Sequence, residues 1–272
     1  MRATLSSEAL PGKPAGQSLI RIDGATLAYP TASGAPVQAL SPIHLSIDGG
    51  TFVSLVGPSG CGKSTLLKIL AGLLRQSEGD VLLGDENLVG PSPQVGVVFQ
   101  QPVLLPWLTI LNNVLLPIRV QRLNVEEYRS RALELLEMVG LEDFASRYPT
   151  ELSGGMQQRA GIVRALVSDP QILLMDEPFG ALDALTREQL NDDLQRIWAE
   201  QRKTVFFITH SIPEAVYLSD RVLVMSERPG RIVADFSVEL PRPRTLDDVS
   251  DPEFADLAKQ IRGLLNAKGV ID

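Results

Sequence analysis

The segment spanning residues 57–64 has the residue types that bind phosphate groups. Its residues are Gly57, Pro58, Ser59, Gly60, Cys61, Gly62, Lys63 and Ser64. They match the pattern G-x-x-x-x-G-K-[ST] between an apolar run and a helical one. Small residues let backbone N–H groups turn toward a phosphate, and the start of the following helix adds partial positive charge. Lys63 then reaches the β- and γ-phosphates, and Ser64 offers its hydroxyl to Mg²⁺. The segment therefore predicts a binding site for a nucleoside triphosphate.

Two adjacent acids close a second apolar run, ILLMDE at residues 172–177. Open α/β sheets bind ligands at the C-terminal ends of their strands, where Asp176 is expected to lie. There Asp176 would hold Mg²⁺, and Glu177 would orient or deprotonate the attacking water. By themselves, two such acids are also compatible with a solvated strand end. The phosphate-binding segment in the same chain favours the catalytic interpretation.

A third motif, LSGGMQQR at residues 152–159, stands between the other two. Ser153 is a good helix N-cap, and Gly154 and Gly155 allow a phosphate to approach the helix start closely. In this order, the three motifs resemble those of the ATP-binding cassette (ABC) ATPases, over roughly residues 18–240. The resemblance implies that the chain hydrolyses ATP, with Mg²⁺ at the site.

The resemblance also implies roles for further residues. Tyr29 corresponds to the aromatic residue that stacks on adenine, and Gln100 to the glutamine that contacts Mg²⁺ and the attacking water. Asp183 corresponds to the acid of a loop that crosses to the opposite subunit. His210 corresponds to the switch histidine that hydrogen-bonds the γ-phosphate. The alternatives are an ordinary strand aromatic for Tyr29 and a structural histidine for His210.

Together the motifs predict three groups of site residues. The catalytic residues are Glu177, His210 and Gln100. The nucleotide-binding residues are Tyr29, Gly57, Pro58, Ser59, Gly60, Cys61, Gly62, Lys63, Ser64, Thr65, Ser153, Gly154, Gly155, Gln157 and Asp183. The Mg²⁺ ligands are Ser64, Gln100 and Asp176. Family members often have an acid after the switch histidine, whereas this chain has Ser211, which with Glu214 matches a capping box.

Strand and helix patterns alternate along the chain. Strands are expected at residues 18–29, 44–47, 51–57, 95–100, 172–175 and 205–209, with a hairpin around Gly84-Asp85. Helices are expected at residues 63–74, 125–140, 154–167, 186–201 and 252–265. The alternation predicts an α/β fold: a P-loop NTPase core with a mostly parallel sheet, an N-terminal antiparallel β portion and a helical insertion subdomain.

The same patterns suggest how the chain is divided. We expect a flexible tail at residues 1–17 and an ATPase domain at residues 18–240. Within that domain, the helical subdomain covers about residues 101–165, where strand signals are few. The C-terminal extension, residues 241–272, is too short for a regulatory β-domain.

Composition excludes several classes of protein. The 272 residues carry a formal net charge of −8, and a nucleic-acid partner is not expected because such proteins usually present a basic face. The single cysteine, Cys61, cannot form an internal disulfide, which fits a reducing compartment; we interpret Cys61 and His44 as structural. We expect no secretory signal, because the N-terminal residues contain no apolar run. We expect no membrane span, since prolines and asparagines interrupt the most apolar stretch, residues 102–118.

The resemblance implies several partners. In the family, the phosphate loop of one subunit faces the LSGG segment of another, so a second ATPase subunit is implied, most simply as a homodimer. A chain without a membrane span implies separate integral-membrane permease subunits and a peripheral position at the cytoplasmic face of the inner membrane. An importer would also depend indirectly on a periplasmic solute-binding protein. Trp107, in LLPWLT near Gln100, is expected on the surface that docks the permease, with plain buried core as the alternative.

Two local features resemble one branch of bacterial importers. They are FQQPVLLPWLTILNNV and the late SERPGRIV followed by LPRPR. Both resemble the nitrate/sulfonate/taurine branch, so we expect uptake of a small anion of that type. The alternatives are an ABC exporter ATPase and a non-transport ABC ATPase. The non-transport types carry coiled-coil insertions or two cassettes, whereas no sustained heptads separate the phosphate-binding segment from the LSGG motif here.

Overall fold

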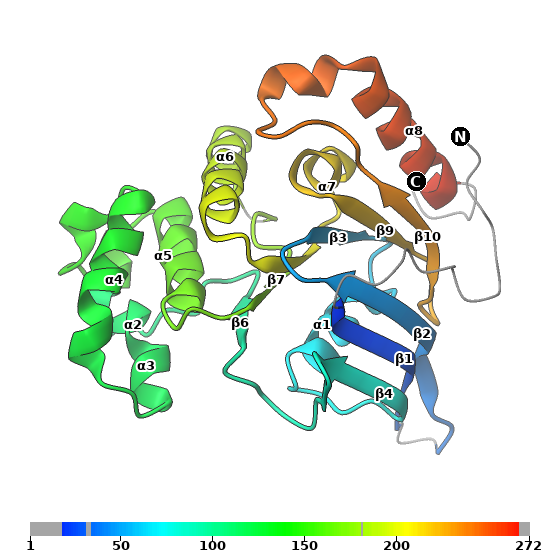
Figure 1. The fold of residues 1–272 in the computed structure, drawn as a ribbon, viewed down its shortest axis with the longest axis horizontal. Coiled ribbons are helices and arrows are strands. Elements are labelled where there is room, and N and C mark those ends of the chain that lie inside the picture. The colour runs from blue at the N-terminus through cyan, green and yellow to red at the C-terminus, as the bar shows by residue number, and fades with distance from the viewer. Residues whose placement is uncertain (1–17, 31–33, 181, 267–272) are drawn as a thin grey trace. The chain divides into compact units, whose positions relative to one another are not determined.

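The computed structural model describes residues 18–30, 34–180 and 182–266 of the chain (Figure 1). The tail predicted at residues 1–17 lies outside this range. The described residues form two compact units. The first contains the residues up to Ser92 and those from Thr204 onward, and the second is Pro93–Lys203.

An antiparallel sheet forms one part of the first unit. Its strands, in spatial order, are β2 (Val37–Asp48), β1 (Ser18–Tyr29), β4 (Glu78–Leu83) and β5 (Glu86–Asn87). The turn between β4 and β5 is the predicted hairpin, with Leu83 opposite Glu86. This sheet confirms the antiparallel β portion expected near the N-terminus.

The other strands of the first unit are mostly parallel. β3 (Phe52–Val56) lies between β8 (Thr204–Ile208) and β9 (Arg221–Met225) and runs parallel to both. β10 (Ile232–Ser237) pairs antiparallel with β9. Every residue of β3 and β8 is buried, which agrees with their continuous apolar sequence.

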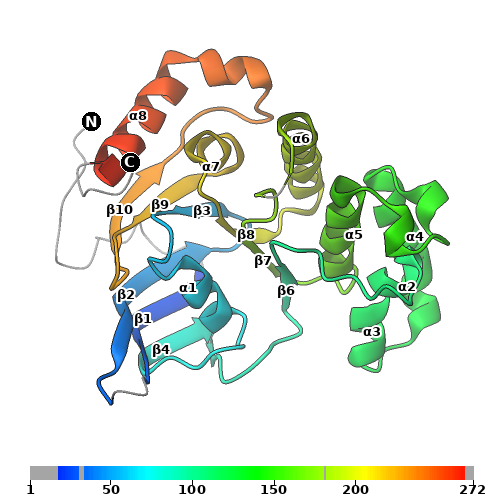
Figure 2. The same ribbon diagram turned by 180° about the vertical axis from the view of Figure 1, so that it is seen from behind.

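Three helices complete the first unit. They are α1 (Lys63–Leu70), α7 (Ile212–Leu218) and α8 (Pro252–Asn266), with a short 3-10 helix at Leu246–Ser250. α7 packs against β3, β9 and α8 (Figure 2). α8 buries Phe254, Ile261 and Leu265, whose spacing places them on one helical face. The helix predicted in the C-terminal extension is therefore confirmed.

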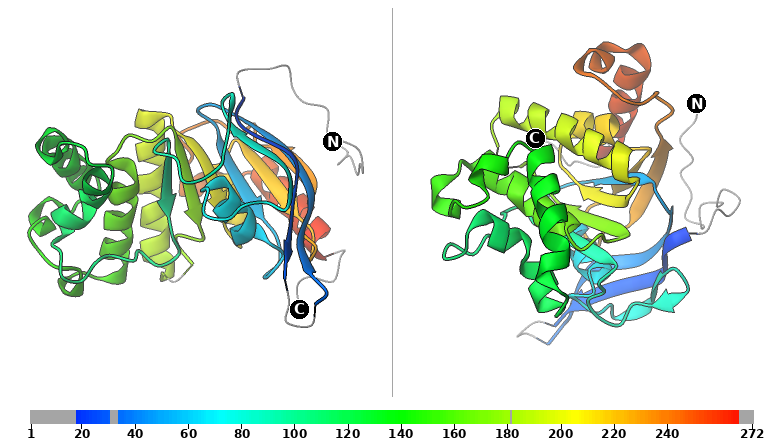
Figure 3. Two further views of the ribbon diagram at one scale, coloured as in Figure 1. Left: turned by 90° about the horizontal axis from the view of Figure 1, so that it is seen from below. Right: turned by 60° about the vertical axis from the view of Figure 1, so that its left-hand side comes forward.

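The second unit combines two parallel strands with five α-helices among its described residues. The strands are β6 (Val95–Val98) and β7 (Ile172–Asp176). The helices are α2 (Ile110–Val114), α3 (Leu116–Val120), α4 (Val125–Met138), α5 (Gly154–Leu166) and α6 (Ala184–Gln201), with 3-10 turns at Glu142–Phe144 and Pro149–Glu151. α5 lies against α2, α3 and α4 (Figure 3). Residues 101–165 contain helices and no strand, as expected.

Some boundaries differ from the sequence expectation. The helix that begins at Lys63 ends at Leu70, because Gly72 adopts a left-handed φ of 68° and its N–H bonds back to Ile69 O. α6 begins at Ala184, two residues early, because Asp183 is its N-cap. The strand expected at residues 44–47 extends to Val37–Asp48, because it pairs with β1 over that length. In the described part of the chain, no helix has the length and apolar character needed to cross a membrane.

Candidate active site

The glycine-rich loop connects β3 to α1 in the first unit. Gly62 is the N-cap of α1 with φ 112° and ψ 7°, a conformation that suits glycine and few other residues. The next residue, Lys63, is only 6% exposed, and its Nζ donates to the carbonyls of Gly57 and Pro58, each at 2.9 Å. The lysine ammonium is thus held against the backbone of the loop.

Cys61 occupies the buried side of this loop. Its side chain is 1% exposed, and burial raises the pKa of the thiol above its usual value. The neighbouring Lys63 opposes this effect but does not outweigh it. A protonated, buried thiol is a weak nucleophile, which agrees with the interpretation of Cys61 as a small packing residue.

Tyr29 lies beside the first turn of α1. Its hydroxyl is 3.3 Å from Thr65 Oγ1, and the residue is 41% exposed at the end of β1. Thr65 follows Ser64 directly, so an exposed aromatic ring stands next to the loop and its hydroxyl residues. This position is compatible with the predicted contact to a nucleotide base.

His210 lies at the same sheet edge as the phosphate loop. β3 and β8 are parallel, Leu55 is opposite Ile208, and the N–H of Thr209 donates to Leu55 O at 3.3 Å. His210 is the next residue and is exposed. The C-terminal end of β3 leads into the loop, so the first unit presents the loop and the histidine at one edge.

The capping box predicted after His210 is only half formed. Ser211 is the N-cap of α7, as expected, and its hydroxyl accepts from the N–H of Glu214 at 3.4 Å. The N–H of Ser211 instead donates to Thr209 Oγ1 at 3.0 Å, and the Thr209 hydroxyl donates to the buried Glu214 carboxylate. The bond expected between the Glu214 carboxylate and Ser211 N–H is therefore replaced by two bonds through the Thr209 hydroxyl. Thr209 and Ser211, the neighbours of His210, are both fixed by these bonds.

Gln100 and the two acids lie at one edge of the paired strands in the second unit. β6 and β7 are parallel with Val98 opposite Met175, so Asp176, the last residue of β7, and Gln100, just after β6, lie at the C-terminal strand ends. Glu177 has a left-handed φ of 44°, and its carbonyl accepts from Gly180 N–H at 3.1 Å. The chain therefore turns over residues 177–180, immediately after the two acids. The structure thus brings these three predicted residues to one edge.

The LSGG segment opens α5 as predicted. Ser153 is the N-cap, and its hydroxyl accepts from Met156 N–H at 3.3 Å. Gly155 packs so closely on Thr186 that a Cβ added to the glycine would lie 2.6 Å from Thr186 Cγ2. The side chain of Gln157 is engaged within this unit, because its amide donates to Pro149 O at 2.9 Å and Leu152 O at 3.2 Å.

Asp183 serves as the N-cap of α6. Its carboxylate accepts from Thr186 N–H at 3.0 Å and from Thr186 Oγ1 at 2.7 Å. The hydrogen bond from the Thr186 side chain is the main reason that the pKa of Asp183 lies below its usual value. Since Thr186 also touches Gly155, the starts of α5 and α6 lie together in this unit.

Two residues of α5 that sequence reasoning missed hold the segment around Gln100. Gln158 donates its amide to Phe99 O at 3.2 Å. Arg164 donates to Val103 O at 2.8 Å and to Pro102 O at 2.7 Å. Val103 has a left-handed φ of 43°, which a β-branched residue rarely adopts, so this segment depends on external support. The only sequence signal for Gln158 is its position inside the LSGGMQQR motif.

The segment that follows presents apolar side chains to solvent. Val103 is 61% exposed and Trp107 is 70% exposed. Beneath them, the fully buried Asn113 accepts from Leu105 N–H at 2.7 Å and donates to Leu105 O at 3.0 Å. A buried amide therefore braces a short segment whose largest aromatic side chain points outward.

The fold and these residues define a class of protein, the α/β nucleotide hydrolases that bind phosphates on a glycine-rich loop. Residues 40–180 match the model of the family described as ABC transporter. The chain is 47% identical to the taurine import ATP-binding protein TauB of Rhizobium johnstonii over 92% of its own length and 97% of that protein. It is 41% identical to the aliphatic sulfonates import ATP-binding protein SsuB of Bacillus cereus, over 93% and 98% of the two chains.

Solved structures agree with the sequence comparisons. The ABC transporter cassette MJ0796, described as dimeric, is 36% identical, superposes with a TM-score of 0.72, and is matched over 82% of this chain and 100% of its own. The same cassette in a post-hydrolysis state bound to ADP and Pi has a TM-score of 0.71, at the same identity and coverage. The present chain belongs to the ABC transporter family, and it is an ATP-binding ATPase of that family.

Proposed function

We propose that this chain is the ATP-hydrolysing subunit of an importer for a small anion of the nitrate, sulfonate or taurine type. The observation that carries the proposal is its 47% identity to a taurine import ATP-binding protein over 97% of that protein. Identity over nearly the whole length includes the segments that distinguish one transporter branch from another, beyond the shared nucleotide motifs. The aliphatic sulfonate relative supports the same chemical class of solute.

The residues proposed to bind the nucleotide are those of the motifs. Backbone N–H groups of residues 57–65, except that of Pro58, which has none, and the Lys63 ammonium would neutralise the phosphates, and Tyr29 would stack on the base. Ser64, Gln100 and Asp176 offer a hydroxyl, an amide oxygen and a carboxylate, which are hard oxygen donors that suit Mg²⁺. Bound Mg²⁺ would supply further neutralisation of phosphate charge.

Glu177 and His210 are proposed to act on the attacking water. Glu177 would accept the water proton as the oxygen attacks the γ-phosphorus and the bond to the β–γ bridging oxygen breaks, releasing ADP and inorganic phosphate. His210 would donate a hydrogen bond to the γ-phosphate. Such catalysis depends on position and on preorganised charge more than on covalent chemistry.

The remaining residues of the predicted site are proposed to act across a dimer. Ser153, Gly154, Gly155 and Gln157 would approach the nucleotide of a second copy, with Asp183 at the same interface. The pairing of Gly155 with Thr186 supports this proposal, because it places the starts of α5 and α6 side by side. A solved relative described as dimeric supports it too.

We further propose a permease subunit as the membrane partner, at the cytoplasmic face of the membrane, with a periplasmic solute-binding protein acting indirectly. The exposed Val103 and Trp107, braced from beneath by Asn113, support a docking surface in this segment. Arg164 would connect that surface to the helix that begins at the LSGG motif.

The experiment that tests this function is affinity capture of the tagged chain from detergent-solubilised membranes, followed by reconstitution of the captured complex in vesicles. We expect a permease with several spans in the eluate. ATP hydrolysis should rise when a solute-binding protein loaded with taurine is added. A Glu177→Gln variant should assemble equally but lose about 10²–10⁴-fold in turnover, as expected for loss of a general base.

A matched control is Glu188→Gln, which changes an exposed acid on α6 and should keep full turnover. Transport that runs outward without a binding protein would overturn import in favour of export. Capture of repair or ribosomal proteins alone would contradict the transport role.

A further inference from the structure

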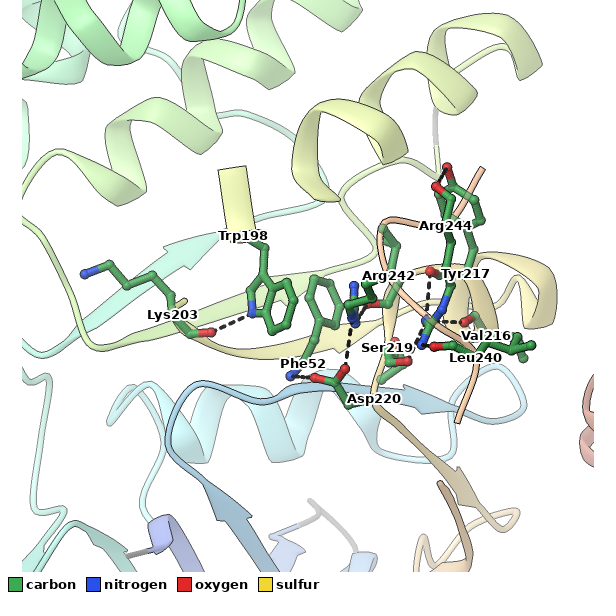
Figure 4. Close-up of polar contacts among 12 residues, drawn as sticks. Phe52, Trp198, Lys203, Val216, Tyr217, Ser219, Asp220, Leu240, Arg242 and Arg244 are labelled. Atoms are coloured by element: carbon green, nitrogen blue, oxygen red, sulfur yellow. Dashed lines mark hydrogen bonds and ion pairs between the residues drawn. The ribbon is translucent and has the colours of Figure 1, made fainter. Parts of the chain in front are cut away.

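The guanidinium of Arg244 is buried at the C-terminal end of α7. The residue is 3% exposed, and its Nη1 donates to Val216 O at 2.8 Å, Tyr217 O at 3.0 Å and Ser219 O at 2.7 Å (Figure 4). The last carbonyls of a helix have no donor within the helix, and they carry partial negative charge. Arg244 supplies both a donor and a positive charge to them.

Arg244 keeps its positive charge although its guanidinium is buried. Burial, and then repulsion from Arg242, lower the pKa of Arg244 to about 10. A group with that pKa remains protonated at neutral pH. The end of α7 therefore binds a permanent charge from the segment that opens the C-terminal extension.

Two neighbouring contacts attach the same segment to the rest of the unit. The Tyr217 hydroxyl donates to Arg244 O at 2.9 Å. Arg242 donates through Nε to Asp220 Oδ1 at 3.0 Å and through Nη2 to Leu218 O at 2.5 Å. Asp220 in turn accepts from Phe52 N–H at 2.8 Å, at the start of the strand that leads into the phosphate loop (Figure 4). Residues 242–244 thus hold the end of α7 against β3.

The other end of α7 carries His210. Thr209 and Ser211, on either side of it, are joined by the bond from Ser211 N–H to Thr209 Oγ1, and Thr209 is bonded to Glu214 within the helix. α7 has only seven residues. Its buried residues include Ile212, Ala215, Val216 and Leu218. Because α7 is short and buried, we expect a shift at its C-terminal end to reach the histidine.

We propose that Arg244 is a positioning residue for His210, acting through α7. The inference rests on the proposed role of His210 in ATP hydrolysis. It assigns the LPRPR segment a task in the reaction that the nucleotide motifs do not include. Arg244 touches no reacting atom, and its effect would be on the placement of the imidazole.

The first test measures turnover in the full chain. Arg244→Gln should lower kcat by about 10-fold or more with little change in KM, since a misplacement of about 1 Å can cost up to roughly 10²-fold. Tyr217→Phe, which removes one hydroxyl and is gentle to the fold, should give a smaller loss of the same kind. In a His210→Ala background, Arg244→Gln should have no further effect, because the two residues act on one step.

A matched control is Arg221→Gln. Arg221 lies in the same unit and donates to Ser46 O at 2.9 Å and to Asp235 Oδ2 at 2.5 Å, but these contacts hold strands and not α7. Its loss should leave kcat unchanged. A kcat that is normal in folded Arg244→Gln, or losses that multiply with those of His210→Ala, would overturn the proposal.

The second test observes the histidine directly. The chain has two histidines, and His44 is paired with Asp23 at 3.0 Å on the antiparallel sheet. In histidine-labelled protein, the Cε1–H resonance of His210 should shift or broaden in both Arg244→Gln and Tyr217→Phe, while that of His44 stays unchanged. Assignment comes from His44→Gln. A His210 resonance that does not move in either variant would overturn the proposal.

These outcomes separate two failures. If His210→Ala hydrolyses ATP normally, the proposed role of His210 is wrong. If His210→Ala is inactive and Arg244→Gln is normal, only the positioning role is wrong.

Discussion

The phosphate loop and the LSGG segment both place glycines before a helix, yet they need them for different reasons. Gly62 caps α1 in a left-handed conformation, and no side chain caps that helix. At the LSGG segment the cap is Ser153 in an extended conformation, and Gly155 is required by space, because Thr186 fills the place of a side chain. Gly62 is required by its backbone conformation, with Leu40 Cδ2 only 2.7 Å from the place of a Cβ, whereas Gly155 is required by packing against Thr186.

The two helices also differ in what they hold. The first residue of α1, Lys63, bonds back to its own loop. α5 instead holds another segment, because Gln158 and Arg164 donate to carbonyls some sixty residues earlier in the chain. The hydrogen bonds of Lys63 are therefore local, whereas the helix of the LSGG segment also supports the chain around Gln100.

The largest effect, on ATP affinity and turnover, is expected from loss of Lys63, which bonds to the carbonyls of its own loop. Lys63→Ala removes the ammonium and leaves two loop carbonyls without their donor, so ATP affinity and turnover should fall by roughly 10²–10³-fold, as for loss of a preorganised donor. Calorimetric titration with ATP and a turnover assay would measure this. Lys68→Ala, an exposed lysine on the same helix, is the control. Equal affinity in the two variants would contradict a phosphate role for Lys63.

The second prediction separates the two uses of glycine. Gly155→Ala should cost about 1–3 kcal/mol by overpacking against Thr186, and adding Thr186→Ser should recover most of it, because serine lacks the methyl group and keeps the hydroxyl bonded to Asp183. Thermal unfolding would show a decrease in Tm of roughly 2–4 °C per kcal/mol and its recovery.

Gly62→Ala provides the contrast for that experiment. It should cost a similar amount, about 1–3 kcal/mol, through backbone strain at φ 112°. Thr186→Ser should not restore it, because the strain at Gly62 and the contact of its added Cβ with Leu40 do not involve Thr186. Failure of the serine to rescue Gly155→Ala would show that the two glycines do not differ in the way described.

The smallest effect is expected from the connection between α5 and the Gln100 segment. Arg164→Lys retains a charge but loses the planar fork that binds two carbonyls, so the free energy of unfolding should fall by about 0.5–1.5 kcal/mol. Denaturant unfolding would measure it. Arg129→Lys, on an exposed position of α4, should be neutral. An equal loss in both variants would remove the distinction between a local loop and a connecting helix.

Much of the fold and of the site followed from local patterns in the sequence. The phosphate loop, the N-caps at Ser153 and Ser211, and the buried strands at residues 172–175 and 205–209 were all predictable. In each case the interaction lies within a few residues along the chain, or the burial follows from an unbroken apolar run. Sequence alone also defines the family, because its three motifs are short and contiguous.

What only the tertiary structure decided is which side chains support those motifs from far away in the chain. Arg244 reaches carbonyls more than twenty residues earlier, and Arg164 reaches Pro102 over a separation of 62 residues. Glu214, expected to bond the start of its own helix, bonds Thr209 instead. Buried polar groups take whichever partner the packing brings within reach, and a one-dimensional pattern does not encode that choice. The motifs could therefore be predicted from the sequence, whereas the long-range hydrogen bonds that hold them in place are seen only in the folded chain.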